Sequence, residues 1–220
     1  MSLDKHDLFQ VAIPGYVFFV VFLSFYAVTG NLATIGQSPN AVVGLVAGIP
    51  LGFLLRLLYW QIIHRWMCEQ YRMGKEECKI VADRVQTQYI DKFVKRVPEG
   101  DRTRTISHVL MFALSEDKNA SYRERIEFHL SNLHALGASI VAVITSLALF
   151  WIVKVWFPVG SGFDSGLLPW FVRLSGLWIV VGFIMYVARG AVKESYKVSL
   201  AVFATIRSRE IEEYIKKAVA

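Results

Sequence analysis

The chain has 220 residues, of which 55% are hydrophobic and only 19% are charged, and its formal net charge is +6. This composition excludes an ordinary soluble domain unless the apolar residues are gathered into membrane-spanning segments. The positive charge alone fits either a membrane surface or nucleic acid, so its distribution along the chain has to decide between them.

Four apolar runs, each about as long as the roughly 20 residues that a helix needs to cross a bilayer, follow one another along the chain. They occupy residues 8–29, 42–63, 133–157 and 167–187. The first run is too long for the apolar part of a cleaved signal peptide, and it follows Asp4, Lys5 and Asp7. We therefore predict an all-α polytopic membrane protein with four transmembrane helices and a helical cytoplasmic region.

The runs divide the chain into an N-terminal transmembrane hairpin (1–63), a cytoplasmic helical insert (64–132), a second transmembrane hairpin (133–188) and a cytoplasmic C-terminal helix (189–220). Lys and Arg are distributed unevenly between the connections. Residues 31–40 contain no charge and residues 158–166 only Asp164, whereas residues 64–132 carry thirteen Lys and Arg. The positive-inside bias predicts a multi-pass protein of the cell membrane with both termini in the cytoplasm.

The excess of basic residues then follows from topology and from attraction to anionic lipid, so the lipid bilayer is the first expected partner. Nucleic acid is not an expected partner, because the basic insert lacks the interleaved aromatic residues of single-strand binders.

Helical periodicity continues outside the apolar runs. It predicts an amphipathic helix at 75–97, a short helix at 106–114 and one continuous helix at about 122–157. In the tail an apolar stripe spaced as on a helix consists of Val192, Tyr196, Leu200, Phe203 and Ile206, and it resumes at Ile211, Tyr214 and Ala218. The stripe fits either packing on the other cytoplasmic helices or a seam between copies, and we favour packing.

The stretch GLVAGIPLGFLLRLLYW places Gly44, Gly48 and Gly52 on one face of the second run. Because little hydrophobic force drives helices together in lipid, such a bare face matters by allowing close backbone approach. The third run is also lined with small residues, including Ala138 and Ala142, so we predict that the second and third runs pack together. Packing within one chain is the favoured interpretation, and packing between copies of a homo-oligomer is the alternative.

Three basic residues lie inside the apolar runs. Arg56 is about 10 Å from the predicted cytoplasmic end of its helix, so its long side chain can reach the interface. A pore-lining or ion-pairing role is the alternative. Lys154 and Arg173 lie near outer ends, where Asp164 could pair with either of them. In a ring of subunits they would form a positive outer vestibule that favours anions.

Motifs that would indicate an enzyme, a cofactor or a metal are scarce, so we expect none of the three. His64 and Cys68 are spaced i, i+4 but lack a third ligand at a recognisable distance. Cys68 and Cys78 both lie on the predicted cytoplasmic side, where thiols stay reduced. Arg102 with His108, and Arg123 with His129, have the spacing found in HEPN-type ribonucleases, which leaves a membrane-bound nuclease as a third alternative.

The first run begins with LFQVAIPGYVFF, and a basic helical insert separates the two membrane hairpins. This layout resembles that of small multi-span accessory proteins of prokaryotic anti-phage and CRISPR systems. The resemblance implies an oligomeric protein that perturbs the membrane or carries a sensing partner. We therefore expect a homo-oligomeric pore or channel-like membrane effector in antiviral defence. The alternative is a non-conducting scaffold or sensor that recruits a soluble cytoplasmic protein partner through its cytoplasmic helices.

Overall fold

The computed structural model describes residues 5–28, 40–62, 69–84, 109–156 and 167–219. All elements of this part are helical, which confirms the all-α prediction. The helices are α1 (Lys5–Val28), α3 (Asn40–Tyr59), α4 (Glu69–Ala82), the 3-10 turn η2 (Asp117–Asn119), α7 (Ala120–Trp156), α8 (Leu168–Ile206) and α9 (Ser208–Val219). A further short helix covers residues 109–115.

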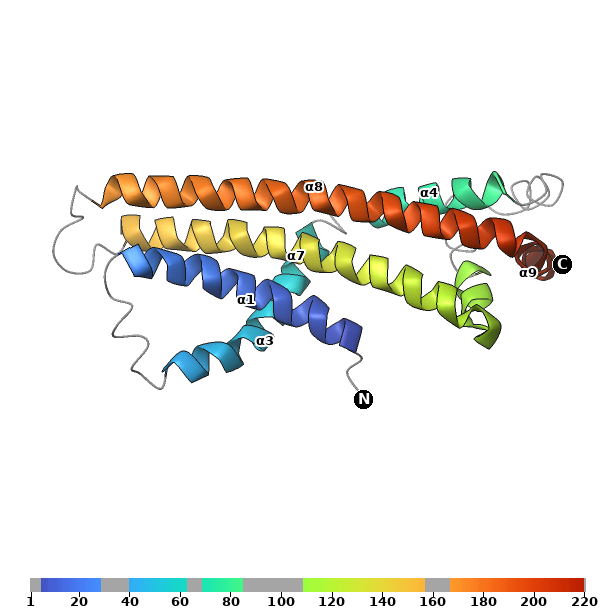
Figure 1. Ribbon diagram of the computed structural model, residues 1–220, viewed down its shortest axis with the longest axis horizontal. Coiled ribbons are helices and arrows are strands. Elements are labelled where there is room, and N and C mark those ends of the chain that lie inside the picture. Colours follow the sequence, from blue (N-terminus) through green and yellow to red (C-terminus); the bar gives the residue numbers. More distant parts are fainter. Residues whose placement is uncertain (1–4, 29–39, 63–68, 85–108, 157–166, 220) are drawn as a thin grey trace. The chain divides into compact units, whose positions relative to one another are not determined.

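Two of these helices are long and apolar enough to cross a membrane: the stretch Asp117–Ile152, most of which is α7, and α8 (Leu168–Ile206). α7 has 37 residues and α8 has 39, and each is an unbroken ribbon in Figure 1. The single helix predicted at 122–157 is therefore confirmed. Shorter apolar helical stretches cover Val11–Phe25 and Ala47–Ile62.

The chain forms two compact units. Unit 1 comprises Met1–Gln61 and Ser131–Gly190, and unit 2 comprises Ile62–Leu130 and Ala191–Ala220. The core of unit 1 is aromatic: Phe25 of α1 stacks on Phe150 of α7 with 4.0 Å between ring centroids, and Phe171 of α8 lies 5.2 Å from Phe150. Aromatic rings fill such a core well because offset and tilted pairs attract each other in addition to the area that they bury.

Hydrogen bonds between the helices of unit 1 pair several polar groups near this core. The Trp178 indole donates to Ser24 of α1 at 2.9 Å, and the Trp151 indole donates to Ser175 at 3.2 Å. The Ser146 hydroxyl donates to the carbonyl of Phe18 at 3.3 Å. Buried polar groups need such partners because an unsatisfied one costs about 1–3 kcal/mol.

In unit 2, α8 and α9 provide several of the buried apolar residues of the described part. Tyr196, Leu200 and Phe203 of α8 are buried, and so are Ile211 and Ile215 of α9. Phe203 contacts the Tyr122 ring, with centroids 5.7 Å apart. The face of the tail stripe that contains Tyr196, Leu200 and Phe203 is thus covered within the chain, whereas Ile206 is 55% exposed.

The amphipathic helix predicted at 75–97 has different bounds in the structure. α4 begins earlier, at Glu69, and ends at Ala82. Its last turn closes with the Asp83 amide bonded to the Lys79 carbonyl and the Arg84 amide bonded to the Val81 carbonyl, which is a tightened helix end. The predicted continuation from residue 85 to 97 lies outside the described residues.

Candidate functional site

The glycine face of α3 lies against α1. A Cβ atom at Gly52 would clash with the carbonyl oxygen of Val11, and one at Gly15 would clash with the carbonyl oxygen of Gly48. At Gly48 itself a Cβ atom would lie 3.0 Å from Cε1 of Tyr16. The two helices therefore cross at backbone contact, as the glycine spacing predicts. Gly44 belongs to α3, but its surroundings lie outside the described residues.

The predicted partner of this face was wrong in one respect. The sequence predicts that the third apolar run packs there. α1 packs there instead, because Gly15 has no side chain where α1 meets the backbone of Gly48 and Gly52. The small residues of α7 are nevertheless used in packing: Ala138 and Ala142 are fully buried, and Ser146, four residues further on, bonds the α1 backbone.

The basic residues of the apolar runs lie in different settings. Arg56 is half-buried on α3. Arg173 is exposed, and its guanidinium carbon lies 5.4 Å from the centre of the Trp170 ring, a cation–π arrangement. The side chain of Lys154 and all of Asp164 lie outside the described residues. The pairing of Asp164 with Lys154 or Arg173 therefore stays a prediction.

A polar junction that the sequence did not reveal joins α3, α7 and α8 in unit 1. The hydroxyl of Tyr59, a fully buried residue, accepts a hydrogen bond from Nη2 of Arg189 at 3.0 Å and lies 3.4 Å from Nδ1 of His134. The Arg189 guanidinium also lies 5.8 Å from the centre of the Tyr59 ring. Trp60 stacks on the His134 ring at 5.5 Å.

Gly137 makes this junction sterically feasible. A Cβ atom there would clash with the Tyr59 ring, so the bare backbone one turn after His134 forms part of the ring's pocket. The arrangement places the Tyr59 hydroxyl, at the end of α3, beside an imidazole inside α7 and a guanidinium inside α8. It can hold the end of α3 against the other two helices, because the guanidinium donates to the hydroxyl oxygen.

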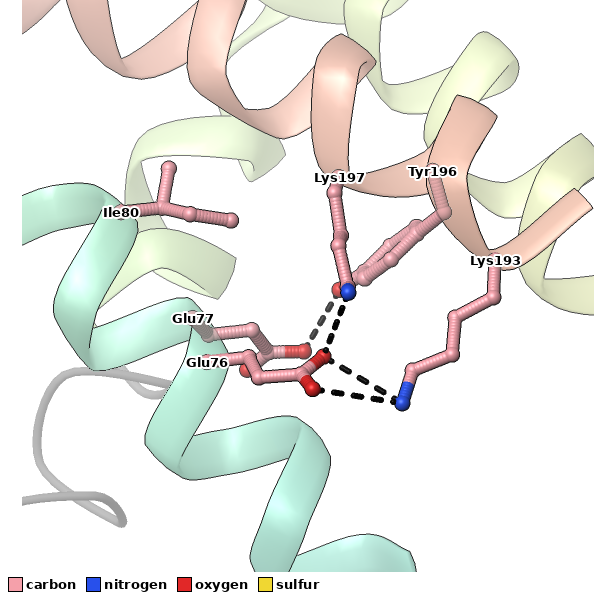
Figure 2. A pocket seen from close by; sticks show the side chains of 6 residues that line it. All are labelled: Glu76, Glu77, Ile80, Lys193, Tyr196 and Lys197. Atoms are coloured by element: carbon pink, nitrogen blue, oxygen red, sulfur yellow. Dashed lines mark hydrogen bonds and ion pairs between the residues drawn. The ribbon is translucent and has the colours of Figure 1, made fainter. Parts of the chain in front are cut away.

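In unit 2 a second polar cluster lines a small pocket between α4 and α8 (Figure 2). Glu76 pairs with Lys193 at 3.3 Å and with Lys197 at 3.2 Å, and Tyr196 donates to Glu77 at 2.6 Å. Partial burial raises the pKa of Glu76, but the hydrogen bond and charge of Lys197 and of Lys193 outweigh this effect, so the pKa lies below its ordinary value. With two carboxylates facing two ammonium groups, the cluster is matched in charge and fastens α4 to α8.

Residues in and beside η2, just before α7, form a third cluster with α9. Glu116 accepts hydrogen bonds from the Tyr214 hydroxyl and from Lys118, and Lys118 also pairs with Glu210 at 3.0 Å. Hydrogen bonds from Lys118 and Tyr214 lower the pKa of Glu116. Next to it, the buried Asn119 side chain donates to the Ala113 carbonyl at 2.6 Å, which fixes the entry into α7.

Of the remaining candidate residues, the structure describes Arg123 and His129. Arg123 donates to the Ser115 carbonyl, and six residues separate it from His129 on one helix, which points the two side chains about 120° apart around the axis. Arg102, His108, His64 and Cys68 lie outside the described residues, as does the side chain of Cys78. Within the described part, no three His, Cys, Asp or Glu side chains come together in a group that could hold a metal ion.

No protein-family model matches the chain, and no curated protein or solved structure is significantly similar to it.

Proposed function

We propose that this chain is an integral membrane protein with four spans, α1, α3, α7 and α8, and with both termini in the cytoplasm. The exposure of α8 supports this proposal: only 11% of its apolar window is buried inside the chain, against 50% for α7. A core helix of a soluble domain would be covered on most sides, whereas α8 exposes Leu177, Ile179 and Phe183 by more than half. Hydrocarbon chains cover such a surface at a gain of about 25 cal/mol per Å² relative to water.

We further propose that the protein acts as a homo-oligomeric pore or channel-like membrane effector. α7 and α8 are about 55 and 58 Å long at 1.5 Å per residue, well beyond the roughly 30 Å of a bilayer core. When the charged end of such a helix moves outside the bilayer, the part inside the bilayer moves with it, because an unbroken helix moves as one rigid element. The described side chains of unit 1 form a packed aromatic core, so an aqueous path would form between copies.

The layout of the chain resembles that of accessory proteins of anti-phage systems, and we therefore propose prokaryotic antiviral defence as the setting. Loss of phage resistance on deletion from a resistant host tests this part separately.

Vesicles containing the purified protein test the pore. With a potassium diffusion potential and a voltage-sensitive dye, the wild-type protein should dissipate the potential, and Gly52→Ala should not, because it forces α1 and α3 apart. Gly176→Ala is the matched control, since a Cβ atom there meets open space. Wild-type vesicles that hold the potential as long as protein-free vesicles would contradict the proposal.

A specific observation favours the alternative, a scaffold that recruits a soluble protein. Met111 and Phe112 in the short helix of unit 2 are adjacent and strongly exposed, at 65% and 64%. Exposed aromatic and methionine side chains are typical of protein interfaces. A partner that co-purifies from native membranes and is lost in Phe112→Ser, but retained in the exposed control Glu127→Ser, would favour the scaffold. A single pure species would count against it.

A further inference from the structure

The polar junction of unit 1 lies at the cytoplasmic end of the proposed spans. Tyr59 is the last residue of α3, His134 is the second residue of the third apolar run, and Arg189 follows the end of the fourth run by two residues. In the proposed topology, these positions lie where the hydrocarbon core meets the headgroups of the cytoplasmic leaflet. The junction is therefore at the depth of lipid phosphate groups.

The helices that form the junction bring positive charge to this depth and no acidic residue. Arg56 and Arg189 contribute two guanidinium groups, while α3 and the parts of α7 and α8 that belong to unit 1 contain no Asp or Glu in their sequence. The acidic residues in the sequence of unit 1 are Asp4, Asp7 and Asp164, which belong to other segments. An anion from outside the chain would complement the charge of the three helices.

The junction is also accessible from the lipid side. Arg189, His134 and Trp60 are each partly exposed. Of the two residues one turn before Arg189 on α8, Met185 packs against the aromatic core of unit 1 and Tyr186 is 63% exposed. Arg189 thus lies at the edge between the packed face of α8 and the face that we propose is covered by lipid.

The groups of the junction form a donor set that suits phosphate oxygens. The Tyr59 hydroxyl accepts a hydrogen bond from Nη2 of Arg189 at 3.0 Å, so its own proton can be donated to Nδ1 of His134, 3.4 Å away. The neutral imidazole then carries its proton on Nε2, where it is a donor. A guanidinium has five N–H donors, and the bond to Tyr59 uses one of them. Guanidinium and imidazole N–H groups from two helices can therefore bind one phosphate group together.

We propose that Arg189 and His134 bind the phosphate of an anionic lipid from the cytoplasmic leaflet. Basic pockets between transmembrane helices on this side of a membrane bind such headgroups. The inference rests on the proposed four-span topology, which sets the depth of the site. A soluble phosphate would meet the same donors, but the surface next to the site favours a lipid. Phe183, Tyr186 and Val187, just before Arg189 on α8, are each exposed by more than half, and acyl chains can lie along them.

Melting midpoints of the full-length protein in detergent with added lipid test this site. Dioleoyl phosphatidylglycerol should raise the wild-type midpoint by several degrees more than dioleoyl phosphatidylcholine, which has the same chains and no net charge. Arg189→Gln and His134→Phe should each lose most of this difference, and His134→Phe keeps a ring on which Trp60 can stack. Arg173→Gln is the matched control and should keep the difference, because Arg173 is an exposed arginine near the other end of α8. Since two lipids are compared for each variant, a lower midpoint of the variant itself does not affect the result.

Each other outcome overturns a stated part of the account. Equal shifts by the two lipids in the wild-type protein, or an equal loss in Arg173→Gln, would overturn the site. Inorganic phosphate should give no shift, and a shift as large as that of phosphatidylglycerol would assign the donors to a soluble anion and overturn the lipid. Extraction of the chain from membranes by alkaline carbonate would overturn the four-span topology and the site with it. A chain that resists carbonate but shows no lipid preference overturns the site and leaves the topology standing.

Discussion

The Tyr59 hydroxyl accepts a hydrogen bond from Arg189, and the contribution of this bond to stability can be measured. Hydrogen bonds to charged groups contribute about 1.5–3 kcal/mol, so Tyr59→Phe should lower the melting midpoint in detergent. Arg189→Gln should do the same. The double variant should lose less stability than the sum of the two single losses, because each single variant already breaks the same contact. Additive effects within about 0.3 kcal/mol would show that the contact contributes nothing.

Gly52 tests the crossing of α1 and α3. Gly52→Ala places a methyl group against the Val11 carbonyl, a backbone atom that cannot move aside alone. Overpacking of this kind costs about 1–3 kcal/mol, so the melting midpoint should fall by several degrees. Gly176→Ala should leave the midpoint unchanged or raise it, since alanine is the better helix former. Equal midpoints for the two variants would mean that the helices do not touch at Gly52.

At this scale the sequence predicted the glycine contact and missed the polar junction. Three glycines one turn apart are a local pattern, and the pattern says that a backbone comes close. It does not say which backbone, and Gly15 stands outside the pattern. His134 lies 75 positions after Tyr59 in the sequence, and Arg189 lies 130 positions after it. No spacing rule could have predicted contacts between residues so far apart.

Among the elements, α4 is held by its contacts with α8 (Figure 2). Tyr196→Phe removes a 2.6 Å hydrogen bond to Glu77 from a buried ring, so amide exchange in residues 69–82 should accelerate several-fold or more. Glu194→Gln is the matched control: its exposed ion pair within one helix contributes about 0.5 kcal/mol or less. Similar exchange in both variants would mean that Tyr196 does not fasten α4.

The contact between Tyr214 of α9 and Glu116, just before η2, should depend on pH. The folded pKa of Glu116 lies below its ordinary value of 4.5. Its contribution is therefore fully present above pH 4.5 and is lost as the pH falls through the lower, folded pKa. The hydrogen bond to Glu116 raises the pKa of Tyr214 above 10.0, so the contribution of Tyr214 is present below pH 10.0 and is lost as the pH rises through the folded value.

Amide exchange of residues 208–219, corrected for the intrinsic pH dependence of exchange, measures both effects. Protection should be constant near neutral pH, fall in acid below pH 4.5 and fall again in strong alkali. Glu116→Gln should remove the acid-dependent loss. Protection that stays constant from pH 7 to 3 in the wild-type protein would contradict this expectation.

The helices themselves were largely predictable, and their ends were less so. The bounds of α7 match the expected continuous helix within about two residues, because apolar periodicity continues from the charged insert into the third run. α4 differs because the amphipathic pattern continues beyond Ala82, whereas the backbone closes into a turn there. α8 and α9 separate at Arg207, where the tail stripe shifts phase by one residue.

At the scale of the whole molecule, charge distribution and apolar runs predicted orientation, but assembly depends on which surfaces stay uncovered. The apolar tail stripe, the obvious candidate for a seam between copies, is mostly buried within the chain.

The mass of the protein extracted from its membrane into lipid nanodiscs, without passage through detergent, tests the central claim most directly. Because the helices of one chain pack closely against one another, an aqueous path would have to be surrounded by helices of several copies. We predict a homogeneous particle containing two or more 25.0 kDa chains. A particle containing one chain, stable across the expression range, would contradict the account.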